Sequence, residues 1–137
     1  MNSKGMSEIN VPEPEGYLYI VADSHLDENI KTAKEFVEML SQLKNAHTVV
    51  FLGDLFKIWL APQKFWTSLH HVTMKGFERL RDSGSNVVFI VGNREMLLPR
   101  KLTDRWKNII PFTHLSHSDW FLNWGDKRYA FTHGDTI

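Results

Sequence analysis

The sequence predicts an α/β domain with a largely parallel sheet, and two sets of observations support this prediction. Three short apolar runs, residues 17–22, 48–52 and 86–91, have the composition of strands that are buried on both faces. Two segments with the apolar spacing of one helix face, residues 28–43 and 64–83, lie between them. Because strands that alternate with helices form crossover units, we expect these three runs to lie parallel in one sheet.

The segment after the third strand predicts a short helix and a hairpin. Residues 102–106 have the pattern of a short helix. Residues 120–124 and 128–132 are apolar runs separated by a turn that contains Gly125-Asp126, which is a strong hairpin signal.

The two ends of the chain differ from the middle. Residues 1–16 are polar and contain two prolines, so we expect a disordered arm followed by one domain over residues 17–137. The sequence stops four residues after His133 without a closing helix or strand, and we interpret this as an incomplete C-terminal end.

Composition excludes several classes of function. Lys plus Arg equals Asp plus Glu at 16 each, so no net basic charge favours nucleic acid as a partner. The chain has no cysteine, which excludes thiolate metal sites. No apolar run approaches the ~18 residues of a membrane span, and no secretory signal is evident. We therefore expect a cytoplasmic protein, and composition leaves open both peripheral contact with a membrane surface and the oligomeric state.

Polar side chains that can bind metals follow four of the predicted strands. They are Asp23 and His25, Asp54, Asn93, and His133. Ligands of open α/β sheets gather at the carboxyl ends of the strands, so we expect these side chains to form one cluster. Glycines next to three of these positions, Gly53, Gly92 and Gly134, would let the backbone turn tightly there.

This set of residues suits the hydrolysis of phosphate esters. Two metal ions can activate a water molecule and neutralise charge on the phosphoryl oxygens. Such a pair needs a bridging carboxylate, and Asp54 is placed to serve. Arg94 offers a planar fork for a phosphate or a diphosphate. His, Asp and Asn ligands favour Mn²⁺ or Fe²⁺, and they also accept Zn²⁺.

The motifs Asp-x-His, Gly-Asp, Gly-Asn-Arg and His-Gly-Asp, in this order and each after a strand, resemble the calcineurin-like metallophosphoesterase superfamily. The longer segments at residues 53–59, 92–98 and 133–136 are similar to the UDP-2,3-diacylglucosamine hydrolases of lipid A synthesis. The resemblance implies an αββα sandwich, here incomplete at the C-terminal end. It also implies cleavage of a phosphate ester or diphosphate bond, which in those hydrolases yields UMP and a lipid monophosphate.

The resemblance also implies roles for individual residues. Asp23 and His25 would bind the first of two divalent ions, Asp54 would bridge both, and Asn93 and His133 would bind the second. Mn²⁺ is expected ahead of Fe²⁺ or Zn²⁺. Arg94 would act on the phosphate of a phosphorylated small molecule or lipid nucleotide, and Asp54, Asn93 and Arg94 would serve catalysis. Metal-activated water would be the nucleophile.

Three departures from the family pattern leave alternatives open. Lys57 stands where the family usually has an acidic residue, and Glu95 replaces the usual aspartate after Gly-Asn-Arg, so its extra methylene is expected to change the support of the ligands. The late Gly-His-x-His motif is absent. The alternatives are a phosphatase or nucleotide phosphodiesterase with another substrate, a member that binds a ligand without catalysis, or a fragment that folds poorly.

Overall fold

The computed structural model describes residues 8–22, 26, 29–56, 59–92 and 95–132. Its central element is a four-stranded sheet in the order β2-β3-β5-β7, in which every pairing is parallel. These strands are β2 (Tyr17–Val21), β3 (Ala46–Leu52), β5 (Asn86–Ile90) and β7 (His114–Ser116). The prediction of a largely parallel sheet is confirmed, and β7 is a strand that the sequence patterns did not reveal.

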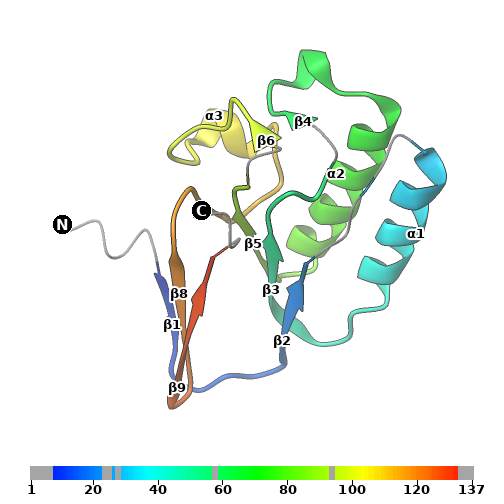
Figure 1. The fold of residues 1–137 in the computed structure, drawn as a ribbon. Helices are drawn as coiled ribbons and strands as arrows, with labels where there is room; N and C mark the ends of the chain where they lie inside the picture. Colours follow the sequence, from blue (N-terminus) through cyan, green and yellow to red (C-terminus); the bar gives the residue numbers. More distant parts are fainter. Residues whose placement is uncertain (1–7, 23–25, 27–28, 57–58, 93–94, 133–137) are drawn as a thin grey trace.

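Two helices cover one face of this sheet (Figure 1). They are α1 (Ile30–Ser41) and α2 (Ser68–Asp82). The predicted second helix begins about four residues later than expected, because residues Gln63–Phe65 form a separate 3-10 turn. Thr67 then caps α2 in a reciprocal arrangement with His70. A short helix, α3 (Asp104–Lys107), follows close to its predicted position.

A second sheet lies against the other face of the central sheet. It has the order β1-β8-β9, and its strands are β1 (Glu8–Val11), β8 (Trp120–Trp124) and β9 (Lys127–Phe131). The predicted hairpin of β8 and β9 is therefore confirmed. The described residues make three layers, helices, sheet and sheet, which is part of the expected sandwich.

The expectation of a disordered arm over residues 1–16 is wrong for residues 8–11. These residues form β1, which pairs in parallel with β8 along Glu8–Val11. The side chain of Val11 is buried between the two sheets, and Ile9 packs against the same core. The arm is held by a partner more than a hundred positions away, so its polar composition alone could not predict this order.

The apolar residues of β3 and β5 alternate between two cores. Val49 and Phe51, with Val87 and Phe89, are buried on the helix side. Val50, Val88 and Ile90 are buried on the side of the second sheet. This burial on both faces explains why these strands are continuous apolar runs in the sequence.

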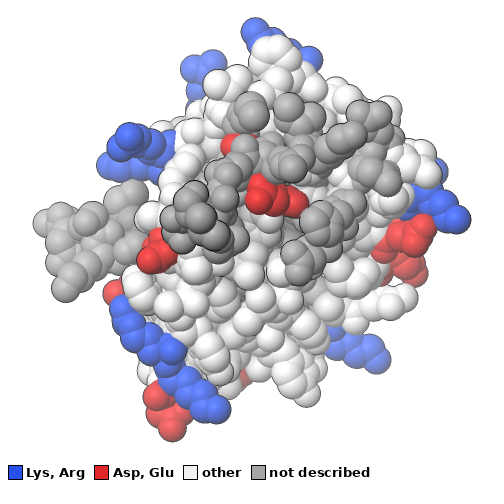
Figure 2. Space-filling view, viewed as in Figure 1, with Lys and Arg blue, Asp and Glu red and all other residues white. Residues whose placement is uncertain are grey.

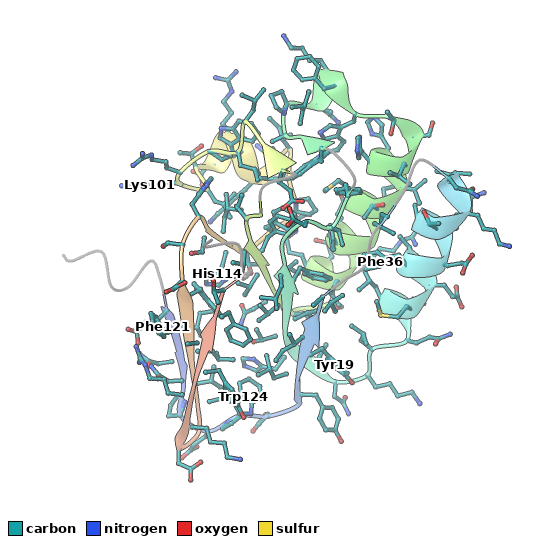
Figure 3. All side chains as sticks on the ribbon, in the orientation of Figure 1. Tyr19, Phe36, Lys101, His114, Phe121 and Trp124 are labelled. Atoms are coloured by element: carbon teal, nitrogen blue, oxygen red, sulfur yellow. The ribbon has the colours of Figure 1, made fainter. Side chains whose placement is uncertain are left out.

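Aromatic side chains fill both cores. Phe36 reaches from α1 to Phe51 and Phe77, with ring centroids at 6.2 and 6.0 Å (Figure 3). Trp59 and Trp120 are fully buried, as expected for core tryptophans. No helix in the described part of the chain is long and apolar enough to cross a membrane.

The strands that precede the predicted ligands point to the same side of the molecule. β2, β3 and β5 are parallel, and the arrowhead of β9 points to the same side in Figure 1. On that side, β4 (Trp59–Leu60) pairs in parallel with β6 (Glu95–Met96) and links the segments that follow β3 and β5.

Candidate functional site

Asp54 lies at the carboxyl end of β3, in the turn that follows Gly53. Its backbone φ is 57°, a left-handed conformation that a residue with a side chain adopts at a cost of about 1–2 kcal/mol. Its side chain is half-buried. The last ladder pair between β3 and β5 joins Leu52 to Ile90, so Asp54 lies beside the turn at Gly92.

The turns after β3 and β5 are in direct backbone contact. A Cβ atom at Gly53 would lie 2.2 Å from the Gly92 nitrogen and 2.5 Å from the Ile90 oxygen. A Cβ at Gly92 would lie 2.6 Å from both the nitrogen and Oδ1 of Asp54. Gly53 and Gly92 therefore allow close approach of two backbones, whereas the sequence predicted only that they let the backbone turn tightly.

The Glu95 carboxylate joins these two turns. Its Oε1 accepts hydrogen bonds from the Asp54 N–H at 2.8 Å and from the Gly92 N–H at 2.9 Å. Its Oε2 accepts a third bond from the Leu55 N–H at 3.1 Å. One side chain thereby satisfies three backbone donors on segments about forty residues apart in the sequence.

Glu95 is 5% exposed, and its electrostatics reflect that burial. Desolvation raises the pKa of the Glu95 carboxyl above its ordinary value, and the three N–H donors oppose this effect. The negative charge of Asp54 raises the same pKa. Two carboxyl groups thus lie close together at the end of the sheet, an arrangement that favours a cation beside them.

Most of the predicted ligands lie outside the described residues. Asp23, His25, Asn93, Arg94 and His133 are in this group, as are Lys57 and Gly134. Their roles stay predictions, supported by the common direction of the strands that precede them. Within the described part of the chain, no three His, Asp or Glu side chains form a metal-binding group.

The two histidines that precede the β8–β9 hairpin, His114 and His117, have partners within the described chain. His117 Nε2 is 2.7 Å from the Pro99 carbonyl oxygen. His114 begins β7, where its Nδ1 lies 2.9 Å from the Thr113 hydroxyl. Burial lowers the pKa of His114, and the positive charge of Lys107 lowers it further.

The described residues at the end of β3 fit the metal role that the resemblance assigns to Asp54. Its carboxylate oxygen lies over Gly92, so the side chain is directed at the turn that leads to Asn93. The Asp54 carboxylate thus lies at the junction of the turns after β3 and β5. Oxygen donors of this kind suit hard divalent ions such as Mn²⁺.

The charged side chains of the described residues are unevenly distributed over the face drawn in Figure 2. On the face drawn in Figure 2, acidic atoms are exposed near the centre. The Lys and Arg side chains of the described residues stand toward the margins, where further acidic atoms are also exposed.

The sequence predicted that Glu95 affects the support of the ligands, but not which groups its carboxylate contacts. The residue stood out there only as a departure from the family aspartate. The available signal was an acidic residue followed directly by three apolar residues, Met96, Leu97 and Leu98, because a carboxylate that becomes buried needs backbone or charged partners.

Comparison with known proteins agrees with this geometry. A family model described as calcineurin-like phosphoesterase matches residues 17–137. Similar curated proteins are named UDP-2,3-diacylglucosamine hydrolase. The one from Ralstonia nicotianae is 25% identical over 125 residues, which cover 89% of this chain and 44% of that protein.

Two further relatives with this name are similar to the chain. The protein from Histophilus somni is 29% identical over 122 residues, covering 87% of this chain and 49% of that protein. The protein from Escherichia coli O1:K1 is 28% identical over 120 residues, covering 85% and 47%. The chain therefore spans about half the length of the curated relatives that it matches.

Proposed function

Because the chain belongs to the calcineurin-like phosphoesterase family, we propose that it provides the metal-binding part of a metal-dependent phosphoesterase. One observation carries the proposal: Asp54 is held at the junction of the turns after β3 and β5. The strands that precede the other predicted ligands end on the same side of the molecule.

Each residue has a defined part in this proposal. Asp23, His25, Asp54, Asn93 and His133 hold two divalent ions, with Mn²⁺ expected first. Once bound, such ions activate water and neutralise phosphoryl charge. Asp54 contributes one carboxylate to both ions, and Arg94 pairs with phosphate oxygens through its guanidinium fork.

The finer proposal concerns the substrate. Three relatives carry the name UDP-2,3-diacylglucosamine hydrolase, so this lipid nucleotide is the first substrate to test. A phosphatase or nucleotide phosphodiesterase with another phosphorylated small molecule is the alternative. The proposed location is the cytoplasm.

Calorimetric titration with Mn²⁺ tests the metal site. Asp54→Asn keeps the size of the side chain and removes its charge, so Mn²⁺ binding should weaken at least tenfold. Asp126→Asn is the matched control, because Asp126 is an exposed aspartate in the turn between β8 and β9 and should leave binding unchanged. Equal Mn²⁺ affinity in wild type and Asp54→Asn would refute the assignment of Asp54.

Turnover is measured on the same samples. Release of UMP from UDP-2,3-diacylglucosamine would support the finer proposal, and hydrolysis of a generic phosphodiester alone would support the alternative substrates. Tight Mn²⁺ binding without hydrolysis of either compound would contradict catalysis by this chain and favour a ligand-binding role.

A further inference from the structure

We propose that Glu95 is a positioning residue that sets the metal-binding geometry of Asp54 by holding the turns after β3 and β5 together. This inference rests on the proposed function, since it concerns the same site. It assigns no contact between Glu95 and a metal ion. Its effect on the site passes through the backbone of Asp54.

The number and direction of its hydrogen bonds argue for this role. The two carboxylate oxygens accept from the N–H groups of Asp54, Leu55 and Gly92 at 2.8, 3.1 and 2.9 Å. Hydrogen bonds to a charged acceptor are stronger than neutral ones, and the site is shielded from water. Glu95 thereby ties the residue proposed to bridge the ions to the turn that leads to Asn93.

The conformation of Asp54 explains why such support is needed. A left-handed backbone at a non-glycine residue is unfavourable unless surrounding contacts stabilise it. The bonds to the N–H groups of Asp54 and Leu55 fix the peptide planes on both sides of the Asp54 Cα atom. The direction of the Asp54 side chain follows from the orientation of those planes.

The position of Glu95 in the fold makes it a stable support. Glu95 pairs with Trp59 in the β4–β6 ladder, and Trp59 is fully buried in the core. The carboxylate therefore extends from a segment anchored in the core toward two turns at the end of the sheet. Movement of either turn would break at least one of its three bonds.

Glu95→Gln is the variant that tests the role with least change in shape. If the amide oxygen takes the place of Oε1, the amide NH₂ group faces the Leu55 N–H, donor against donor. Mn²⁺ affinity should then fall by roughly 10–100-fold, as is typical when a residue that orients a metal ligand is changed. The electron paramagnetic resonance spectrum of bound Mn²⁺ should also change, because it reports the geometry of the ligands.

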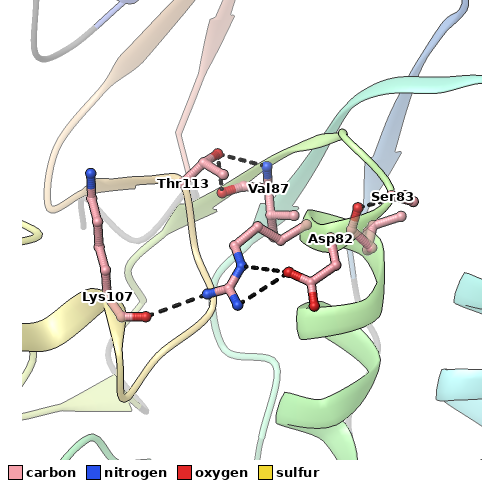
Figure 4. A network of polar contacts seen from close by, with 7 residues as sticks. Asp82, Ser83, Val87, Lys107 and Thr113 are labelled. Atoms are coloured by element: carbon pink, nitrogen blue, oxygen red, sulfur yellow. Dashed lines mark hydrogen bonds and ion pairs between the residues drawn. The ribbon is translucent and has the colours of Figure 1, made fainter. Parts of the chain in front are cut away.

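Thr113→Val is the matched control. The Thr113 hydroxyl accepts from the Val87 N–H at 2.7 Å and donates to the Val87 carbonyl at 3.0 Å (Figure 4). Like Glu95→Gln, this variant removes a side-chain group that accepts a hydrogen bond from the backbone of β5 or its following turn. The Thr113 contact lies at the amino end of β5, whereas the Glu95 contact lies beyond its carboxyl end. Thr113→Val should lower the thermal midpoint and leave Mn²⁺ affinity within about twofold of wild type.

Amide hydrogen exchange in metal-free wild-type protein provides a second measurement that needs no variant. The N–H groups of Asp54, Leu55 and Gly92 should exchange as slowly as neighbouring ladder amides in β3 and β5. Exchange at the rate of exposed loops would overturn the proposal. The proposal would also be overturned if a folded Glu95→Gln variant bound Mn²⁺ with wild-type affinity and lost that affinity when Asp54→Asn was added.

Failure of the proposed function gives a different result. A wild-type chain that binds no Mn²⁺ refutes the metal site, and the exchange rates then decide alone whether Glu95 holds the two turns. Slow exchange of all three amides then shows that Glu95 holds the two turns together without a metal-positioning role, and fast exchange refutes that contact as well.

Discussion

Replacement of Gly53 by alanine tests the contact on which the site depends. A Cβ at this position would lie 2.2 Å from the Gly92 nitrogen, 2.5 Å from the Ile90 oxygen and 2.7 Å from the Gly92 Cα, and real Cβ atoms essentially never approach closer than 3.0 Å. All three neighbours are backbone atoms, so no side-chain rotation can relieve the clash. The turns after β3 and β5 must separate by about 1 Å.

The free-energy cost has two parts. Forcing a methyl group into a packed site costs roughly 1–3 kcal/mol. Separation of the turns also breaks one of the two bonds to Glu95 Oε1, which are 2.8 and 2.9 Å long, and leaving a buried N–H without a partner costs roughly 1–3 kcal/mol. We expect Gly53→Ala to lower the free energy of unfolding by roughly 2–6 kcal/mol, and Mn²⁺ affinity to fall with it.

Urea unfolding followed by tryptophan fluorescence measures this change, since Trp59 and Trp120 are fully buried. Gly84→Ala is the control: the Gly84 φ is +100°, but no atom lies within 4 Å of a Cβ built there. The control should lose only the roughly 1–2 kcal/mol of an unfavourable backbone conformation. If Gly53→Ala is no less stable than Gly84→Ala, the reasoning about the contact between the two turns is refuted.

Three further predictions concern the rest of the fold. Phe77→Ala should lower the free energy of unfolding in urea by roughly 3–5 kcal/mol, because Phe77 is fully buried. Phe65→Ala, at a 44% exposed position, is the control and should lower it by under about 1 kcal/mol. Similar losses for the two variants would contradict the described core. Folding lowers the pKa of His114 from 6.5, so in acid the unfolded chain binds a proton at this residue more readily than the folded chain does. The free energy of unfolding should therefore fall as the pH drops below 6.5. His114→Gln should reduce this dependence, and an unchanged pH profile of the thermal midpoint would exclude His114 as its source. Gly76→Ala places a Cβ 2.8 Å from Val37 Cγ2, so it should lower the free energy of unfolding despite the helix propensity of alanine. Val37→Ala in the same chain should restore roughly 1 kcal/mol of that loss. Additive effects of the two substitutions would show that the two helices do not meet there.

Local sequence patterns were sufficient for most of the regular elements. The runs at β2, β3 and β5 are apolar because both faces of these strands are buried, and the helix spacing of α1 follows from burial of Ala33, Phe36 and Leu40. Such patterns record one-sided or two-sided burial directly, so they can be read without knowledge of the partner. The parallel arrangement of these three strands then followed from the rules of α/β sheets.

The sequence predicted at which ends of the strands the candidate ligands lie, but not the contacts that hold Asp54 in place. Asp54 and the other predicted ligands could be placed at strand ends because parallel strands end at one edge of a sheet. The left-handed backbone of Asp54 and the three bonds to Glu95 could not be predicted in this way. They depend on which N–H groups the folded chain brings within reach of one carboxylate.

The sequence by itself determined the α/β class, the positions of the main strands and helices, and the residue types available for phosphoester chemistry. Only the tertiary structure decided that residues 8–11 form a strand, that β4 pairs with β6, and that Glu95 joins two turns. The physical reason is the range of the interactions. Burial and helix spacing act on neighbours in the sequence, whereas the two strand pairings join residues 36 to 113 positions apart and exist only once the chain has folded. Glu95 likewise reaches back 41 and 40 positions to the N–H groups of Asp54 and Leu55.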